Sequence, residues 1–134
     1  MAVRVKIRLR AGSREVATSA LVNTGFESPA PDVAVPIAVV KALGLWPPAR
    51  AWFVSADTGG GEVEMAYIEA GAELELEGRR LVVNLVVNPY IDEVLLSDYV
   101  AGELCITILD AKRGLWRFCN EDAVRQSAEP QRWR

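Results

Sequence analysis

The sequence contains no histidine, and this absence excludes several kinds of catalytic site. Ser–His and Cys–His pairs need an imidazole as general base, and many zinc and iron sites need imidazole ligands. Cys105 and Cys119 are the only cysteines, too few for a disulfide scaffold or a four-thiolate metal site. We therefore expect no metal site and no cofactor. Cys105 lies in an apolar run and is expected to be a small buried hydrophobe; the sequence leaves the state of Cys119 open.

Net positive charge and long apolar runs are also missing. The formal net charge is -3 over 134 residues, so overall charge gives no argument for nucleic-acid binding. The longest apolar stretch, residues 33–46, contains Pro36, Lys41 and Gly44 and is shorter than the ~20 residues that cross a bilayer. The N-terminus alternates apolar and basic residues rather than forming a leader. We expect a soluble, cytoplasmic protein that binds neither membranes nor nucleic acid.

Alternation of apolar and polar residues is the main pattern that is present. Val3, Val5, Ile7 and Leu9 alternate with basic residues and predict a strand over 3–10 with one buried face. A second strand is predicted over 14–22, and it becomes wholly apolar at its end. A strand of that kind enters the protein centre, so the residue that follows it, Asn23, is expected near the core.

The rest of the sequence predicts short strands, tight turns and short helices. A helix opens at Pro36 and ends at Gly44, and Ser97 caps a second helix over 98–103. Strands are expected over 32–35, 50–56, 62–70, 72–77, 81–87, 93–96, 104–109 and 115–118, with a glycine-rich hairpin tip over 57–61. The predicted fold is mostly β, a closed or nearly closed barrel with one or two short helices. Residues 1–118 form the domain, and 119–134 form a polar, loosely ordered tail.

The order of four features resembles that of retropepsin-like aspartic proteases, the single-domain relatives of pepsin. These features are the run Ala20-Leu21-Val22-Asn23-Thr24-Gly25, the helix ending in Leu43-Gly44-Leu45, the glycine-tipped hairpin, and Glu93-Val94-Leu95-Leu96-Ser97-Asp98. The resemblance covers residues 3–118. It implies an acid-protease barrel, a flap made by the hairpin, and a homodimer that binds an extended peptide and needs no cofactor.

The resemblance also implies roles for individual residues. Asn23 occupies the position of the catalytic Asp, Thr24 holds the loop by hydrogen bonds across the dimer, and Gly25 lets the backbone approach the substrate. Substrate-binding residues would be Phe26 and Glu27 beside this loop. From the flap, Asp57, Thr58, Gly59 and Gly60 would also contact substrate.

Asn23 departs from the family at the decisive position. The family mechanism needs two carboxylates that share one proton, one from each copy of the chain. An amide holds a water by hydrogen bonds but cannot accept its proton near neutral pH. Ser97 stands where the family usually has Gly, and Phe26 and Glu27 replace smaller residues. The chain is therefore expected to be an aspartic endopeptidase only if position 23 is Asp, and inactive or impaired as written.

Three interpretations of Asn23 remain open from the sequence. It is a natural divergence in a non-catalytic peptide-binding or dimerisation module, an engineered substitution that silences an enzyme, or an ordinary turn residue in an unrelated β-barrel. The literal Asp57-Thr58-Gly59 is a poorer candidate for the catalytic motif. It follows Ser55-Ala56 rather than an apolar pair, and it opens a glycine run typical of an exposed tip.

Overall fold

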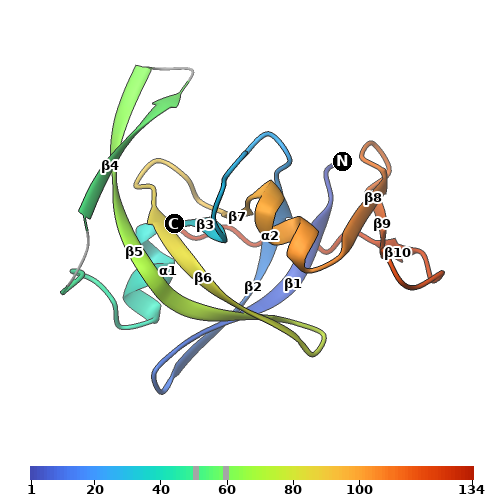
Figure 1. Cartoon of the computed structure of the whole chain (residues 1–134), viewed down its shortest axis with the longest axis horizontal. Helices are drawn as coiled ribbons and strands as arrows, with labels where there is room; N and C mark the ends of the chain where they lie inside the picture. The colour runs from blue at the N-terminus through green and yellow to red at the C-terminus, as the bar shows by residue number, and fades with distance from the viewer. Residues whose placement is uncertain (50–51, 59–60) are drawn as a thin grey trace.

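The computed structural model describes residues 1–49, 52–58 and 61–134, and it is mostly β with two short helices (Figure 1). The strands are β1 (Arg4–Ala11), β2 (Arg14–Val22), β3 (Asp32–Val35), β4 (Trp52–Thr58), β5 (Gly61–Leu76), β6 (Arg79–Val87), β7 (Val94–Leu96), β8 (Ile106–Asp110), β9 (Leu115–Phe118) and β10 (Arg125–Gln126). The helices are α1 (Ile37–Ala42) and α2 (Asp98–Glu103).

Six strands close into a barrel. Their order is β1-β2-β7-β3-β6-β5, with β4 added beside β5, and a further pairing of β1 with β5 closes the ring. That closing ladder is short, running from Arg8↔Glu75 to Arg10↔Glu73. The expected closed β-barrel is therefore confirmed.

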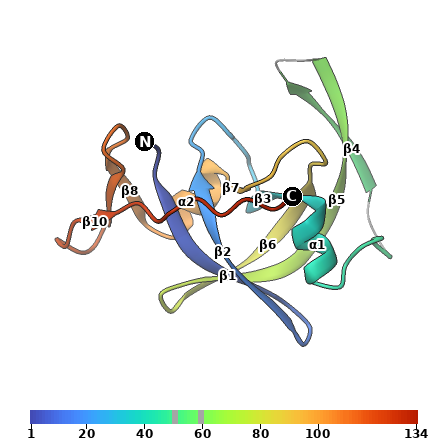
Figure 2. The same ribbon diagram turned by 180° about the vertical axis from the view of Figure 1, so that it is seen from behind.

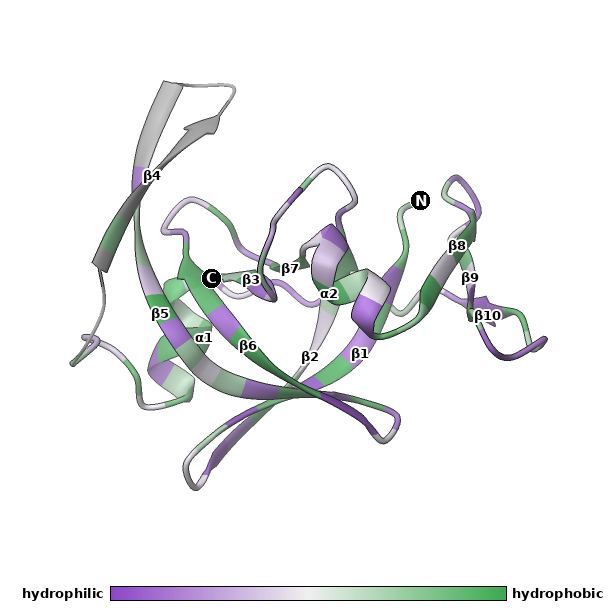
Figure 3. Ribbon diagram, in the orientation of Figure 1, coloured by the Kyte–Doolittle hydropathy of each residue, from purple (hydrophilic) through white to green (hydrophobic). Residues whose placement is uncertain are grey.

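The barrel interior is filled by the apolar face of each strand. Val5, Ile7 and Leu9 of β1, and Val3 just before it, are all at most 2% exposed, while Lys6, Arg8 and Arg10 between and after them are exposed. This alternation is visible along β1 and β5 in Figure 3. Burial of apolar side chains from every wall supplies the main favourable term for this fold.

One long bent strand replaces two predicted ones. We expected separate strands over 62–70 and 72–77, whereas β5 is continuous over 16 residues. The register against β6 shifts between Ile68 and Ala72, and Ala70 has a positive φ of 49°. The Asn84 side chain accepts a hydrogen bond from the displaced Ala70 N–H at 2.9 Å. This bulge bends the strand without ending it.

A three-stranded sheet, β10-β9-β8, lies beside the barrel. Cys105 immediately precedes β8 and Cys119 immediately follows β9, and the two form a disulfide. Cys105 is only partly buried and has a positive φ of 63°, so the expectation of a small buried hydrophobe is wrong. Its conformation is that of a turn residue, which places it opposite Cys119 in the hairpin.

The C-terminal segment lies against the barrel, although we expected residues 119–134 to be loosely ordered. Residues 127–133, which we call the strap, cross β1 and β2 on the side seen in Figure 2. Ser127 and Ala128 donate backbone hydrogen bonds to Gly114 and Arg4, and Trp133 packs against the core. The polar side chains that suggested a solvated tail instead pair with polar groups of the barrel.

Candidate functional site

The loop that begins at Asn23 is held between two strands of the barrel. β2 pairs in parallel with β7, from Ala20↔Val94 to Val22↔Leu96. The ladder continues one step further, because the Asn23 N–H donates to the Leu96 carbonyl at 3.1 Å. The apolar end of β2 therefore delivers Asn23 where the sequence predicts it, at the end of a core strand and partly buried.

The side chain of Asn23 closes a tight turn. Its Oδ1 accepts a hydrogen bond from the Gly25 N–H at 3.1 Å, and its carbonyl accepts one from the Phe26 N–H at 3.0 Å. A Cβ at position 25 would lie 3.3 Å from Asn23 Oδ1, tighter than most real contacts, so glycine suits this position. Thr24 and Gly25 are exposed, Phe26 is half-buried and Glu27 is exposed.

Helix α2 fixes the far side of the same loop. The Asp98 N–H donates to the Phe26 carbonyl at 2.9 Å, and Asp98 Oδ1 accepts from the Ser28 N–H at 2.9 Å. Ser97 is fully buried and caps the helix, accepting from the Val100 N–H at 3.4 Å. The first turn of α2 therefore positions the loop as well as capping the helix.

A polar cluster beside this loop centres on Asp32. Its Oδ1 accepts hydrogen bonds from Tyr67 Oη at 2.7 Å and Asn84 Nδ2 at 3.0 Å, and its Oδ2 accepts one from Ser28 Oγ at 2.6 Å. Asp32, the first residue of β3, therefore ties the loop to β5 and β6. The sequence contained one weak signal for this cluster, the polar Asn84 inside the apolar run of β6.

Tyr67 is perturbed by its place in this cluster. Burial, and then the hydrogen bond to Asp32, raise the pKa of Tyr67 from 10.0 to about 12. The phenol therefore stays neutral over the physiological range and acts as a hydrogen-bond donor to the carboxylate. Among the described residues, the hydrogen bonds of Asn23 go to backbone groups of Gly25, Phe26 and Leu96 rather than to a carboxylate.

The hairpin that the sequence predicts around residues 57–61 is formed by β4 and β5. Asp57 and Thr58 lie in β4 and pair with Glu62 and Gly61 of β5, rather than in the hairpin tip as the sequence predicts. Gly59 and Gly60 lie outside the described residues. The hairpin projects from the barrel on the same side as the loop after β2 in Figure 1, and Phe53 is 67% exposed.

Two open grooves lie elsewhere, and residues of the strap line both of them. One is bordered by Arg8, Thr18 and Gln131, and the other by Val5, Leu76 and Trp116. Neither is lined by the loop after β2.

Neither the described structure nor comparison with known proteins adds a membrane span, a metal site or a family to this geometry. Within the described residues, no helix is long and apolar enough to span a membrane, and no group of acidic or cysteine side chains could hold a metal ion. No model of a known protein family matches the sequence, and a search of curated proteins finds no match.

Proposed function

We propose that this protein is a homodimeric retropepsin-like aspartic endopeptidase homologue that is inactive or impaired as a peptidase. The geometry of the Asn23 loop carries the proposal. The apolar strand β2 leads into Asn-Thr-Gly, and the Asn23 N–H donates to Leu96 of the core strand β7. Helix α2, which follows β7, holds the loop through Asp98. The closed barrel and the projecting hairpin are consistent with the same architecture.

The chemistry that this arrangement would perform depends on two copies of position 23. Two aspartates facing each other across a two-fold axis would share one proton, and the ionised one would take a proton from the attacking water. Two asparagines keep the hydrogen bonding but cannot accept that proton. An extended peptide would bind between the dimer core and the hairpins through strand-like backbone hydrogen bonds.

The test is to substitute Asn23→Asp and assay a peptide library over a broad pH range. The variant should gain cleavage on the acid side that pepstatin inhibits, whereas the unsubstituted protein should show none. Asp122→Asn in the Asn23→Asp background is the matched control, and it should retain activity because Asp122 is exposed and lies between β9 and β10, outside both the loop and the hairpin. A folded, dimeric Asn23→Asp protein without activity at any pH would contradict the enzyme proposal.

A non-catalytic β-barrel module that binds peptides or dimerises is the second candidate. Asn23 favours it, because its amide closes the turn by accepting from the Gly25 N–H but cannot act as a general base. In that case partners recovered by pull-down should persist when Asn23 is replaced by Ala. Loss of all partners in Asn23→Ala would instead place recognition at the loop.

A further inference from the structure

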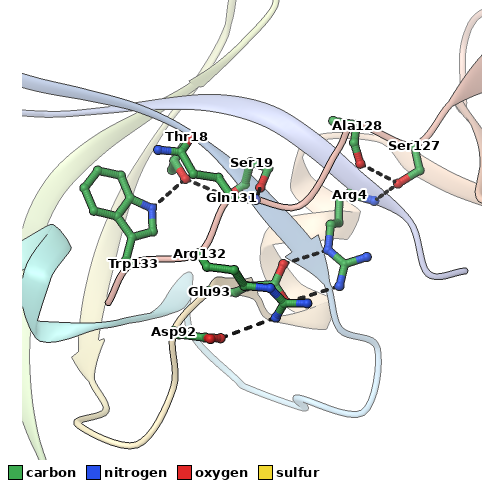
Figure 4. Close-up of polar contacts among 10 residues, drawn as sticks. All are labelled: Arg4, Thr18, Ser19, Asp92, Glu93, Ser127, Ala128, Gln131, Arg132 and Trp133. Carbon is green, nitrogen blue, oxygen red and sulfur yellow. Dashed lines mark hydrogen bonds and ion pairs between the residues drawn. The ribbon is translucent and has the colours of Figure 1, made fainter.

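The strap contacts the two strands that carry and support the Asn23 loop. On β2 it reaches Thr18 and Ser19, and before β7 it reaches Asp92 and Glu93 (Figure 4). Directly after these residues, β2 and β7 begin to pair at Ala20↔Val94. The strap therefore clamps one end of this parallel pair, and the Asn23 loop leaves from the other end.

Two buried hydroxyls of β2 find partners in the strap. Thr18 is 4% exposed, and its Oγ1 accepts a hydrogen bond from Trp133 Nε1 at 2.9 Å. Ser19 is 5% exposed, and its Oγ accepts one from the Gln131 N–H at 2.7 Å. Without the strap both hydroxyls would lose these partners, and the strand would lose the cover that keeps them buried.

The buried carboxylate of Glu93 is shared between two arginines. Arg4 of β1 donates from Nε at 2.6 Å and from Nη2 at 3.1 Å, and Arg132 of the strap donates from Nη1 at 2.9 Å. Glu93 is 7% exposed, so its interactions are screened less than those of a surface pair. Arg132 Nη1 also lies 3.3 Å from Asp92 Oδ1. The start of β7 is thereby anchored to both β1 and the strap.

We propose that the strap is a positioning element for the Asn23 loop and acts through β2 and β7. The strap contacts lie close to the loop along the strands. Three successive β2–β7 pairs, with a rise of about 3.3 Å per residue, separate them from the Asn23–Leu96 hydrogen bond. Releasing the strap would free one end of the pair and raise the frequency with which the other end opens. The proposal treats the Asn23 loop as the functional site, but its test requires no catalysis.

The test is amide hydrogen exchange in the full-length variant Arg132→Gln/Trp133→Phe. Phe keeps the aromatic packing of Trp133 but removes the donor to Thr18, and Gln removes the charge beside Glu93. The amides of Asn23 and Asp98, which close the loop, should exchange about tenfold faster. Amides of the β5–β6 ladder, on the other side of the barrel, should keep their rates.

Two further variants separate positioning from general stability. The single variant Arg132→Lys should exchange as slowly as the unsubstituted protein. A lysine ammonium can replace the one nitrogen of Arg132 that contacts both carboxylates. Arg134→Gln is the matched control: its side chain is 77% exposed and pairs only at 3.5 Å with Asp92, so loop exchange should not change. Equal acceleration of loop and ladder amides, or acceleration of neither, would overturn the proposal. An inactive Asn23→Asp protein would contradict the proposed function and leave this exchange result unaffected.

Discussion

At the scale of single residues, Asp32 has the most hydrogen-bonded side chain near the candidate site. It accepts from Ser28, which is 4 residues away in sequence, and from Tyr67 and Asn84, which are 35 and 52 residues away. Hydrogen bonds to an ionised acceptor are stronger than those between neutral groups. Asp32 therefore fixes how the Asn23 loop meets β5 and β6, although nothing in its local sequence distinguishes it from a turn residue.

Tyr67 gives this cluster a measurable pH dependence. Its pKa rises from 10.0 in a free tyrosine to about 12 in the folded protein. Because the folded pKa is the higher one, the contribution of Tyr67 to stability is complete below pH 10. It is lost as the pH rises through the interval from 10 to about 12.

We therefore expect the unfolding free energy to fall in this alkaline interval, as measured by urea denaturation at a series of pH values. Tyr67→Phe should be less stable at neutral pH and should lose less stability across the interval. Tyr90→Phe is the matched control, because Tyr90 is 79% exposed, and it should keep the alkaline loss. If the unfolding free energy falls equally with pH in Tyr67→Phe and in the unsubstituted protein, the pKa of Tyr67 is not the cause of the alkaline loss.

At the scale of elements, local patterns predicted most strands and both helices. Alternation located β1 and β2, and Ser97 marked the start of α2, where the structure confirms it as a cap. The continuity of β5 could not be predicted, because Ala70-Gly71 has the composition of a turn. What carries the strand through is the Asn84 side chain, a partner supplied by β6 across the sheet.

The pairing of Cys105 with Cys119 was equally invisible to local patterns, because it depends on how the β8–β9 hairpin brings the ends of two strands together. The two cysteines are 14 residues apart, and closing a loop of this size stabilises a fold by about 3 kcal/mol, chiefly by restricting the unfolded chain. We expect Cys119→Ser to lower the unfolding free energy by about this amount.

Urea denaturation with and without a thiol reductant measures the effect. The unsubstituted protein should lose stability when reduced, whereas the double variant Cys105→Ser/Cys119→Ser should be insensitive to the reductant. Equal urea midpoints for the oxidised and reduced unsubstituted protein would show that the Cys105–Cys119 disulfide does not contribute to the unfolding free energy.

At the scale of the whole molecule, the barrel is closed by contacts that are remote in sequence. Arg8 pairs with Glu75 and Arg10 with Glu73, and the strap from the other end of the chain covers β1 and β2. Apolar alternation predicted that a sheet would close but not which strands would meet. The order in which distant segments pair is a property of the assembled core, so no single segment encodes it.

The homodimer is the prediction that belongs to the molecule as a whole. Thr24 is exposed in one copy of the chain, and the proposed function places its hydroxyl in hydrogen bonds across a two-fold axis. Thr24→Val keeps the shape and removes the hydroxyl from both copies. Loss of two net hydrogen bonds of about 1 kcal/mol each should weaken dimerisation by a factor of about 10 to 100.

Analytical ultracentrifugation over a range of protein concentrations measures this dissociation constant. Ser13→Ala is the matched control, since Ser13 is also exposed but lies in the turn at the opposite end of β2, and it should leave association unchanged. If the folded protein stays monomeric at the highest concentration, a site shared by two copies across a two-fold axis is ruled out. Without that site, position 23 could not form an acid–base dyad even as Asp, because a single copy supplies only one such loop.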